Sequence, residues 1–379
     1  MRLAFLLYKY FPYGGMQRDF RRFVEESQAL GHHCRVYYIS WQGEPMAGAD
    51  LRQVPVSAFS NHRRNVRFSR WVRSDLATDP VDGVVGFNKM PDLDVYYAAD
   101  SCYLDKAFNE RSWWYRLGTR FRHFSAYERA VFGDQSDTQI LLISETEKAK
   151  FKHFYGTSEE RMHMLPPGIS MNRKAPLDFA ERRQNKRRAL GFTDCDHVLL
   201  FVGSGFIKKG LDRAIQSLAN IDSNVTEKNI RLLIVGQDKE TRFRRLATRL
   251  KVADRIEFLG GRDDIPELLL AADALVHPAK DEAAGIVLLE ALVAGLPVLV
   301  TDVCGYAHHI AQADAGVVLS APYQQQDLDR AVEQSLGTGF HTRCRENALR
   351  YAQEQDLYSM HSTGAQLIEG FIAQKESVA

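Results

Sequence analysis

The chain has 379 residues, more than one ordinary hydrophobic core holds, and this length predicts two domains. Hydrophobic residues make up 45% and charged residues 26%, globular values that exclude a mostly disordered or collagen-like chain. Lys and Arg number 49 against 48 Asp and Glu, so the net charge of +1 excludes a basic field over the whole protein, and no nucleic-acid partner is expected.

Cysteine usage and the apolar runs predict the compartment. The five cysteines are scattered and form no C-x-x-C pair, which is typical of reduced cytosolic thiols. The first apolar run, Leu3 to Tyr8, is shorter than the core of a secretory signal and leads into Lys9. No stretch approaches the roughly 18 apolar residues that indicate a membrane span. We therefore expect a cytoplasmic protein, either free or resting on a membrane surface.

Short β-rich runs alternate with amphipathic segments along the chain, the pattern of parallel sheets with helical crossovers. A first helix is predicted from Met16 to Leu30 and is ended by Gly31. In the first half, strands are predicted at 3–8, 34–39, 83–87, 94–98, 139–143 and 162–165. In the second half, they are predicted at 197–202, 231–235, 255–259, 274–277, 297–301 and 316–319.

A stiff segment separates the two halves. Leu165-Pro166-Pro167-Gly168 is turn-prone, and the charged segment from Arg173 to Arg188 that follows has few apolar residues. We predict an α/β protein of two facing, doubly wound, Rossmann-like domains, residues 1–168 and 169–355. A last helix in 356–379 follows the second sheet.

Doubly wound sheets bind ligands beyond the carboxyl ends of their strands, so the loops there are candidate sites. The first loop ends in Gly14-Gly15 and opens a helix, an arrangement that suits a phosphate, although a plain turn explains it too. The corresponding loop of the second half, Gly203 to Gly210, lacks the Lys-Ser/Thr of an ATP-binding P-loop. Its Lys208 and Lys209 can offset the charge of a diphosphate, with solvated lysines as the alternative.

Two glutamates separated by seven residues form the most specific pattern. Glu282 lies in the loop after a predicted strand, and Glu290 lies in the second turn of a helix that opens near Gly285. Both carboxylates are therefore expected at the mouth of one sheet. Helix capping is the alternative for either glutamate alone, but it explains the loop-then-helix placement less well.

This glutamate segment resembles the signature of retaining glycosyltransferases of family 4, which have the GT-B fold. The similarity extends over nearly the whole chain and is closest to enzymes that build the lipopolysaccharide core. The stretches that carry it are Tyr8 to Asp19, Val85 to Pro91, and Glu282 to Glu290 continuing to His308. The resemblance implies that the first domain binds the acceptor, that the second binds the nucleotide sugar, and that the last helix returns to the first domain.

The resemblance also implies site roles. Glu282 would hold donor-sugar hydroxyls and Glu290 the ribose, while Lys208 and Lys209 would hold the diphosphate. Relatives usually have arginine at position 208, and lysine lacks the bidentate fork. Asp100 stands where many relatives have a histidine and is a cleft candidate for catalysis, together with Lys208, Lys209 and Glu282. Asp19 is a cleft candidate for donor binding. The other residues expected to bind the donor are Gly15, Gly203, Arg262, Gly285, Ile286 and Val287.

A metal-free reaction is expected, because lysines and backbone N–H groups can stabilise the charge on a departing diphosphate. No cofactor is expected, since the UDP-sugar is a co-substrate. Asp92-Leu-Asp94 mimics the D-x-D metal motif of the other glycosyltransferase fold, but a lone D-x-D is common. His32-His33 and His308-His309 are adjacent, so neither pair has metal-ligand spacing on a helix.

The segment from Tyr103 to Phe132 interleaves aromatic and cationic residues. This composition suits a helix in an anionic membrane interface, although a helix whose aromatics complete the core is the alternative. The residues expected to contact the inner-membrane surface are Trp113, Trp114, Tyr115, Arg116, Arg120 and Arg122. Base stacking on nucleic acid is a third interpretation without a supporting motif.

Together these features predict a cytoplasmic, membrane-associating hexosyltransferase that moves a hexose, first of all glucose, from a UDP-sugar to a heptose of the lipopolysaccharide inner core with retention. UDP-N-acetylgalactosamine or another UDP-hexosamine is the alternative donor. A UDP-sugar epimerase of the same fold is the rival enzyme, and a membrane-bound assembly protein that only recognises core sugars is the rival without catalysis.

Overall fold

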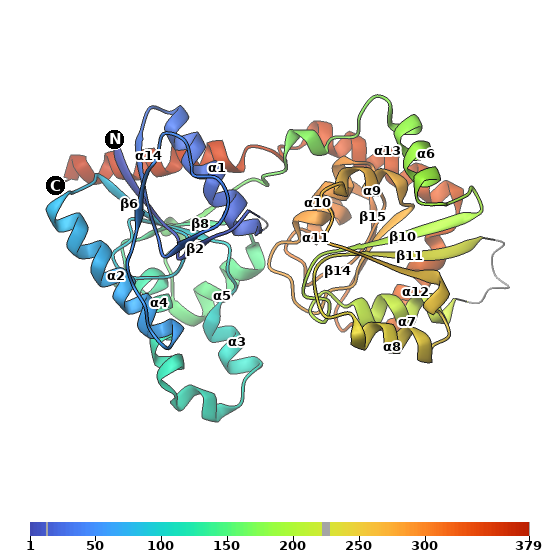
Figure 1. The fold of residues 1–379 in the computed structure, drawn as a ribbon, viewed down its shortest axis with the longest axis horizontal. Helices are drawn as coiled ribbons and strands as arrows, with labels where there is room; N and C mark the ends of the chain where they lie inside the picture. The colour runs from blue at the N-terminus through green and yellow to red at the C-terminus, as the bar shows by residue number, and fades with distance from the viewer. Residues whose placement is uncertain (13, 222–227, 379) are drawn as a thin grey trace. The chain divides into compact units, whose positions relative to one another are not determined.

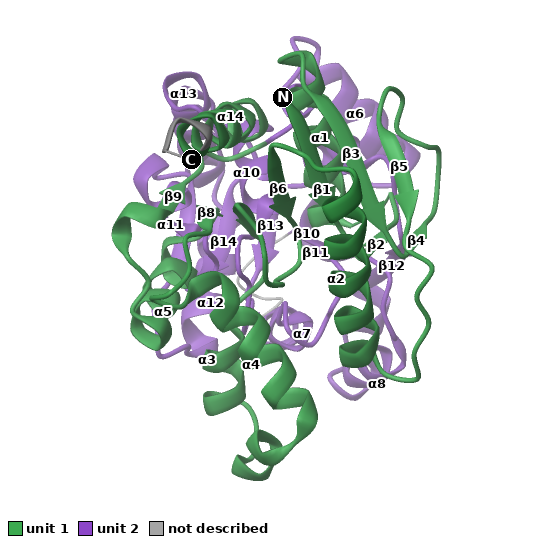
Figure 2. Ribbon diagram, turned by 90° about the vertical axis from the view of Figure 1, so that its left-hand side faces the viewer, with its two compact units in different colours: residues 1–168, 359–379 green, residues 169–358 purple. Residues whose placement is uncertain are grey.

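The computed structural model describes residues 1–12, 14–221 and 228–378, and the chain divides into two compact units (Figures 1 and 2). Unit 1 contains Met1–Gly168 and Ser359–Ala379, and unit 2 contains Ile169–Tyr358. The chain leaves unit 1 at the end of the Leu-Pro-Pro-Gly segment. None of the helices in the described ranges has the length and apolar character needed to cross a bilayer.

Unit 1 is built on a parallel sheet of seven strands in the order β5-β3-β1-β6-β7-β8-β9. The chain moves from β1 to one side through β3 and β5, and then to the other side from β6 onward, so the switch point lies between β1 and β6. The strands are β1 (Arg2–Leu6), β3 (His33–Tyr38), β5 (Asp50–Gln53), β6 (Gly83–Gly86), β7 (Val95–Ala98), β8 (Gln139–Leu142) and β9 (Met162–Met164). The short strands β2 (Lys9–Tyr10) and β4 (Ser40–Trp41) pair separately.

The helices of unit 1 include the last helix of the chain, α14 (Met360–Val378), which lies against α1 (Gly15–Ala29). One glycine permits this close contact, and a second permits the contact of α14 with strand β6. A Cβ on Gly364 would stand 2.2 Å from the Phe23 ring, and one on Gly83 would stand 2.4 Å from Ile372. The remaining helices are α2 (Asn61–Thr78), α3 (Tyr103–Asn109), η1 (Trp113–Leu117), α4 (Thr119–Phe132), α5 (Glu145–Tyr155) and η2 (Glu159–Arg161).

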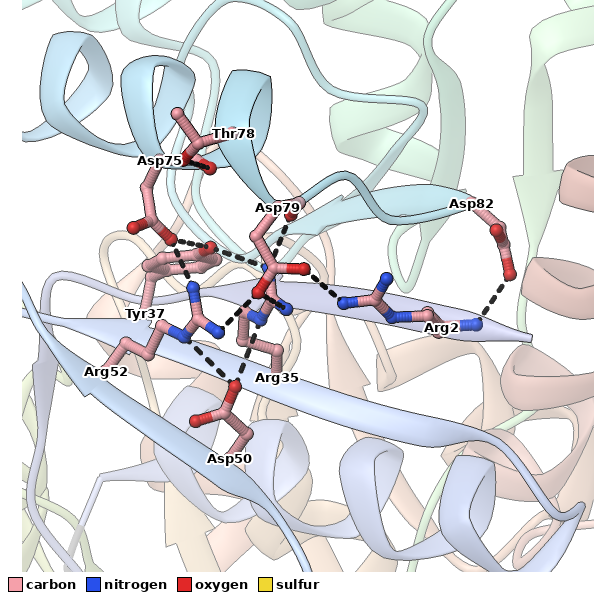
Figure 3. Close-up of polar contacts among 9 residues, drawn as sticks. All are labelled: Arg2, Arg35, Tyr37, Asp50, Arg52, Asp75, Thr78, Asp79 and Asp82. Carbon is pink, nitrogen blue, oxygen red and sulfur yellow. Dashed lines mark hydrogen bonds and ion pairs between the residues drawn. The ribbon is translucent and has the colours of Figure 1, made fainter.

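A network of arginines and aspartates fixes the carboxyl-terminal end of α2 to the sheet (Figure 3). Asp79 accepts hydrogen bonds from Arg2 at 2.5 Å, from Arg35 at 2.5 Å and from Arg52 at 2.7 Å. Arg52 also donates to Asp75 at 2.6 Å. Arg35 is almost fully buried, with 7% of its side chain exposed. The hydrogen bonds from Arg2 and Arg52 lower the pKa of Asp79 to about 2.

Unit 2 contains a parallel sheet of six strands in the order β12-β11-β10-β13-β14-β15. Here the switch point lies between β10 and β13. The strands are β10 (Asp196–Val202), β11 (Asn229–Val235), β12 (Ile256–Gly260), β13 (Ala274–His277), β14 (Val298–Thr301) and β15 (Gly316–Leu319). The helices are η3 (Met171–Arg173), α6 (Phe179–Ala189), α7 (Leu211–Asn220), α8 (Thr241–Arg249), η4 (Ala253–Arg255), α9 (Ile265–Ala271), α10 (Ile286–Val293), α11 (Ala307–Ala313), α12 (Gln325–Ser335) and α13 (Thr338–Glu354).

The two parallel-sheet units establish the predicted α/β class with Rossmann-like domains. The sequence predicted that the charged segment 173–188 is part of the domain boundary. Instead, most of this segment forms α6 inside unit 2. Arg183 and Arg187 of this helix bind the Asp273 carboxylate at 2.6 and 3.1 Å. The helix is thus attached to the core by ion pairs, which a hydrophobic pattern does not reveal.

Candidate donor and acceptor sites

The switch point of unit 2 brings two predicted loops together. The loop 203–210 follows β10, and the loop that carries Glu282 follows the neighbouring strand β13. The backbone N–H of Lys280 donates to the Lys208 carbonyl at 2.6 Å. Gly210 has a φ of +73°, and a Cβ there would stand 2.0 Å from the Pro278 carbonyl oxygen. The loops therefore dock through their backbones, and only glycine fits at position 210.

Lys209 and Glu282 form an ion pair at this edge. The Nζ atom of Lys209 contacts Oε2 of Glu282, and the two side chains are 21% and 17% exposed. Gly203 makes room for the lysine, because a Cβ there would stand 2.7 Å from Cδ of Lys209. His277 lies beneath the pair, fully buried, with Nε2 3.5 Å from the same glutamate oxygen.

These neighbours set the protonation of Glu282. Burial raises its pKa, but the contact with His277 and the charge of Lys209 outweigh burial and lower the pKa to about 2. Burial lowers the pKa of His277. Glu282 is therefore a carboxylate at neutral pH and is unsuited to the role of a general acid.

Two further lysines at the edge each meet a carboxylate. Nζ of Lys208 lies 3.0 Å from Asp281, and Nζ of Lys280 lies 2.6 Å from Asp212. The Lys208 side chain is 61% exposed. Exposed ion pairs of this kind are weak, so a phosphate group can compete with Asp281 for Lys208.

The start of α10 lies beside Glu282. Gly285 precedes the helix with a φ of +83°, and a Cβ there would stand 3.4 Å from Cγ of Glu282. Ile286 is half-buried and Val287 is buried in the core. The first N–H groups of a helix lack partners within it and carry its positive dipole end. This helix start therefore offers hydrogen-bond donors to an anion next to Glu282.

The other predicted donor residues of unit 2 are engaged in ion pairs. Glu290 is 9% exposed, and Nε of Arg173 lies 3.3 Å from its carboxylate. Arg262 is exposed after β12 and binds Asp264 through hydrogen bonds of 2.7 and 2.8 Å. The sequence analysis did not predict that His277 lies next to Glu282 or that Arg173 pairs with Glu290. His277 ends a predicted strand, and Arg173 begins a charged segment without a motif.

The predicted residues Gly15 and Asp19 lie in unit 1. Gly15 is exposed at the start of α1, and a Cβ there would meet nothing within 4 Å. Asp19 binds Nε2 of His361 at 3.0 Å and accepts a hydrogen bond from the Tyr97 hydroxyl at 2.8 Å. Asp19 therefore attaches the first turn of α14 to the unit 1 sheet.

A pocket of about 520 Å³ lies at the carboxyl edge of the unit 1 sheet, around its switch point. Asp100, exposed after β7, lines it together with residues that follow β1 and β6. The full lining is Leu7, Tyr8, Lys9, Phe11, Met16, Gln17, Asn61, Arg64, Asn65, Asn88, Lys89, Asp100, Ser101, Tyr103, Lys106 and Phe124.

A buried glutamate holds the loop that carries Asp100. Glu128 has no exposed surface and accepts hydrogen bonds from the backbone N–H groups of Tyr103 and Leu104 at 2.8 and 3.0 Å. Lys89 pairs with the same carboxylate at 2.5 Å and donates to the Ser101 carbonyl at 2.9 Å. The wall of the pocket is thus fixed by a charged group behind it.

The aromatic segment differs from the single helix that was predicted. It forms α3, η1 and α4, because the chain turns at Glu110 to Ser112 and again at Gly118. Phe132 is fully buried in α4, so part of the segment completes the core as in the alternative interpretation.

The exposed aromatic side chains gather at η1. Trp113 and Trp114 stack with ring centroids 3.5 Å apart and are 52% and 64% exposed. Tyr115 shares a 2.8 Å hydrogen bond with the Tyr103 hydroxyl. Arg116 lies 4.5 Å from the Phe108 ring centroid. Arg120 and Arg122 are exposed on α4.

The D-x-D aspartates are paired with cations. Asp92 binds Arg73, and Asp94 binds Lys375 of α14 at 2.6 Å. Across the ranges that the structure describes, no three Asp, Glu, His or Cys side chains come together as a group that could hold a metal.

The fold and the edge of unit 2 define a glycosyltransferase of the GT-B class. Residues 182–352 match the family described as "Glycosyl transferases group 1", and residues 13–173 match "Glycosyltransferase Family 4". The chain belongs to this glycosyltransferase family, as its sequence predicted.

One relative is similar over the whole length. The lipopolysaccharide glucosyltransferase WaaG of Escherichia coli (strain K12) is 46% identical over 98% of this chain and 99% of its own. The crystal structure of WaaG, a glycosyltransferase involved in lipopolysaccharide biosynthesis, matches with a TM-score of 0.90 over 97% of this chain and 100% of that one. Sucrose-phosphate synthase from Thermosynechococcus elongatus, 16% identical, shares the fold with a TM-score of 0.78 over 98% of this chain and 99% of its own.

Proposed function

We propose that this protein transfers a glucosyl group from UDP-glucose to a heptose of the lipopolysaccharide inner core, with retention of the anomeric configuration and without a metal ion. The observation that carries the proposal is the 46% identity with the lipopolysaccharide glucosyltransferase of Escherichia coli over 98% of this chain. The ion pair of Lys209 and Glu282 at the switch point of unit 2 supports it, because ligands bind doubly wound sheets at this place.

We assign the donor to unit 2. The diphosphate would accept hydrogen bonds from the backbone at Gly285 to Val287 and from Lys208 and Lys209. Glu282 would then accept hydrogen bonds from sugar hydroxyls, and Glu290, held by Arg173 at 3.3 Å, would bind the ribose. Arg262 would flank the base, and Gly203 would leave space for the lysine. The guanidinium of Arg173 would thereby orient the Glu290 carboxylate.

The chemistry follows from these charges. As the bond from the sugar to the diphosphate breaks, negative charge grows on the leaving phosphate, and lysine Nζ and helix N–H groups stabilise it. The acceptor hydroxyl attacks the anomeric carbon from the same face, and its proton passes to the leaving phosphate oxygen. Glu282 remains a carboxylate throughout, since its pKa is about 2.

The acceptor is assigned to the pocket of unit 1. Asp100 and the amide side chains of Asn61, Asn65 and Asn88 line it and provide hydrogen-bonding groups for sugar hydroxyls. Asp100 can accept a hydrogen bond from an acceptor hydroxyl. We assign Asp19 a structural role, because its carboxylate is bound to His361 and Tyr97.

We also propose that η1 rests on the anionic cytoplasmic face of the inner membrane. The stacked indoles of Trp113 and Trp114 are more than half exposed, and Arg116, Arg120 and Arg122 lie near them in sequence. Sedimentation with vesicles of anionic phospholipid tests this. A triple variant, Trp113→Ala with Trp114→Ala and Arg116→Ala, should stay in the supernatant, and equal sedimentation of variant and wild type would reject the contact.

Mass spectrometry of a truncated core acceptor, incubated with a panel of UDP-sugars, tests the function. We expect the mass of one hexose to be added from UDP-glucose, and no addition by Glu282→Ala. Addition only from UDP-N-acetylgalactosamine would assign the other donor. Interconversion of the UDP-sugar without acceptor would indicate the epimerase instead. Full activity in excess EDTA is expected for a metal-free reaction.

A further inference from the structure

The pocket of unit 1 is positively charged. Four of its lining side chains are cationic, and only Asp100 is acidic. Lys89 is neutralised by Glu128 behind the wall, at 2.5 Å. Lys9 and Arg64 still outnumber the one carboxylate in the lining, so the pocket attracts an anion rather than a neutral sugar alone.

Arg64 is the residue whose hydrogen bonding is incomplete. It lies in the first turn of α2, and its Nη2 donates to Oδ1 of Asn61 at 2.8 Å. Its Nε is buried and has no hydrogen-bond partner among the described residues. A buried donor of a charged group costs free energy when it is left without an acceptor. A phosphate or carboxylate oxygen in the pocket would satisfy it and could use the guanidinium fork.

The helix that carries Arg64 is fixed at its far end. Asp75 and Asp79, in the last turn of α2 and just after it, are bound by Arg35 and Arg52 from β3 and β5 (Figure 3). The helix is therefore held against the sheet. Because Arg64 is on this fixed helix and not on a mobile loop, binding a ligand costs less conformational entropy.

We propose that Arg64, assisted by Lys9, binds an anionic group of the acceptor saccharide, a phosphate or a carboxylate, and so selects charged over neutral acceptors. This inference rests on the proposed function and adds the chemical class that the unit 1 pocket recognises. The volume of about 520 Å³ lies in the range of roughly 300–1,000 Å³ typical of ligand pockets. The amides of Asn61, Asn65 and Asn88 line the same pocket and suit the hydroxyls of the ring that bears the anion.

Steady-state kinetics with a matched pair of acceptors test the proposal. One acceptor keeps its anionic groups, and the other has them removed by dephosphorylation and carboxyl reduction. For Arg64→Gln we expect the KM of the anionic acceptor to rise about tenfold to a hundredfold, the loss of one charge-assisted contact. The KM of the neutral acceptor and the Kd of UDP should remain within twofold of wild type. Arg63→Gln, an exposed neighbour on α2 that does not line the pocket, is the matched control and should behave as wild type.

Inorganic phosphate and lipid vesicles distinguish the sources of the anion. Phosphate should inhibit the wild type competitively with the anionic acceptor and inhibit Arg64→Gln much less. Vesicles of anionic phospholipid without saccharide should not compete, and competition by them that Arg64→Gln abolishes would assign the pocket to a lipid headgroup and overturn the proposal. If Arg64→Gln does not fold, Lys9→Gln replaces it, with a smaller KM increase expected.

These outcomes distinguish a failure of the proposed function from a failure of the anion subsite. A wild type that glucosylates neither acceptor refutes the proposed function. A wild type that glucosylates both acceptors equally, or an Arg64→Gln variant that keeps the wild-type preference, refutes only the anion subsite.

Discussion

Two clusters of paired charges in this protein differ in how deeply their cations are buried. In the network near the amino ends of β1 and β6, Asp79 binds three arginines, and Arg35 is 7% exposed (Figure 3). At the carboxyl edge of unit 2, Lys208 lies 3.0 Å from Asp281, and its side chain is 61% exposed. The first arrangement fixes a helix, and the second leaves a lysine able to exchange its partner for a phosphate.

The comparison shows why ion pairs alone do not identify a site. Multiply bonded, buried pairs lose much when one member is removed, whereas single exposed pairs contribute little to stability. The Lys209 and Glu282 pair lies between these limits, because it is half-buried at the switch point and His277 lies beneath it. Its position at the ligand-binding edge, rather than its energy, indicates function.

Arg35→Met should have the largest effect on stability and should leave catalysis unchanged. The change removes the buried guanidinium from Asp50 and Asp79, which are 52% and 37% exposed, and we expect the free energy of unfolding to fall by about 1–3 kcal/mol. Urea denaturation followed by tryptophan fluorescence measures it. The kcat of the folded variant at low temperature should stay within twofold of wild type, and a normal midpoint would show that the network is not structural.

Glu282→Ala and Lys209→Ala should reduce kcat much more than stability. Removing one group that stabilises transition-state charge lowers kcat by about 100- to 1,000-fold. The melting temperature should also fall, because the pair is largely buried, but the folded variant should remain nearly inactive. Lys280→Ala, whose partner is Asp212, is the control for simple loss of charge. An inactive Lys280→Ala with an active Lys209→Ala would reverse our assignment.

Acid should destabilise unit 2 through His197. This histidine is 2% exposed and contacts the Ser335 hydroxyl at 3.1 Å, and burial lowers its pKa to about 4. The unfolded chain, with a pKa near 6.5, binds the proton first, so stability falls as pH drops from about 6.5 towards 4, by about 3 kcal/mol for this group.

A His197→Gln variant should lose part of this slope. Urea midpoints at pH 7.5, 6 and 5 measure the difference. Parallel pH profiles for variant and wild type would contradict the assignment.

Glu128→Gln should act on the acceptor and should also lower the stability of unit 1, because the carboxylate is fully buried and accepts several hydrogen bonds. The amide keeps the shape but leaves Lys89 without its counter-ion, which loosens the loop that carries Asp100. We expect the acceptor KM to rise about tenfold with the donor KM unchanged. Tyr155→Phe, which removes one 2.6 Å hydrogen bond to the same carboxylate, should give a smaller change. Equal increases in both KM values would indicate general loosening.

The sheets and their edges were predictable because short apolar runs alternate with helical segments, and a doubly wound protein places the loops after its strands at one edge. Lys209 and Glu282 could be brought together in this way, since β10 and β13 are neighbours. The short strands β2, β4 and β5 were missed, because they are only two to four residues long and lack an apolar run. Helix α6 was missed because arginines rather than apolar residues attach it.

Other site features depend on contacts between distant segments. Asp19 resembled a donor ligand by its position in the first motif, but its partner His361 lies at the other end of the chain. Arg64 is an ordinary basic residue of a charged helix, and only the orphaned Nε in the folded pocket distinguishes it. No local sequence pattern indicates the contact of Asp19 with His361 or the unsatisfied Nε of Arg64.

The position of uridine diphosphate in crystals of this protein tests the central claim most directly. We predict density for the diphosphate at the first turn of α10, within hydrogen-bonding distance of Lys209 and the N–H groups of Ile286 and Val287. Density for the nucleotide in the unit 1 pocket, with the α10 edge empty, would contradict the account.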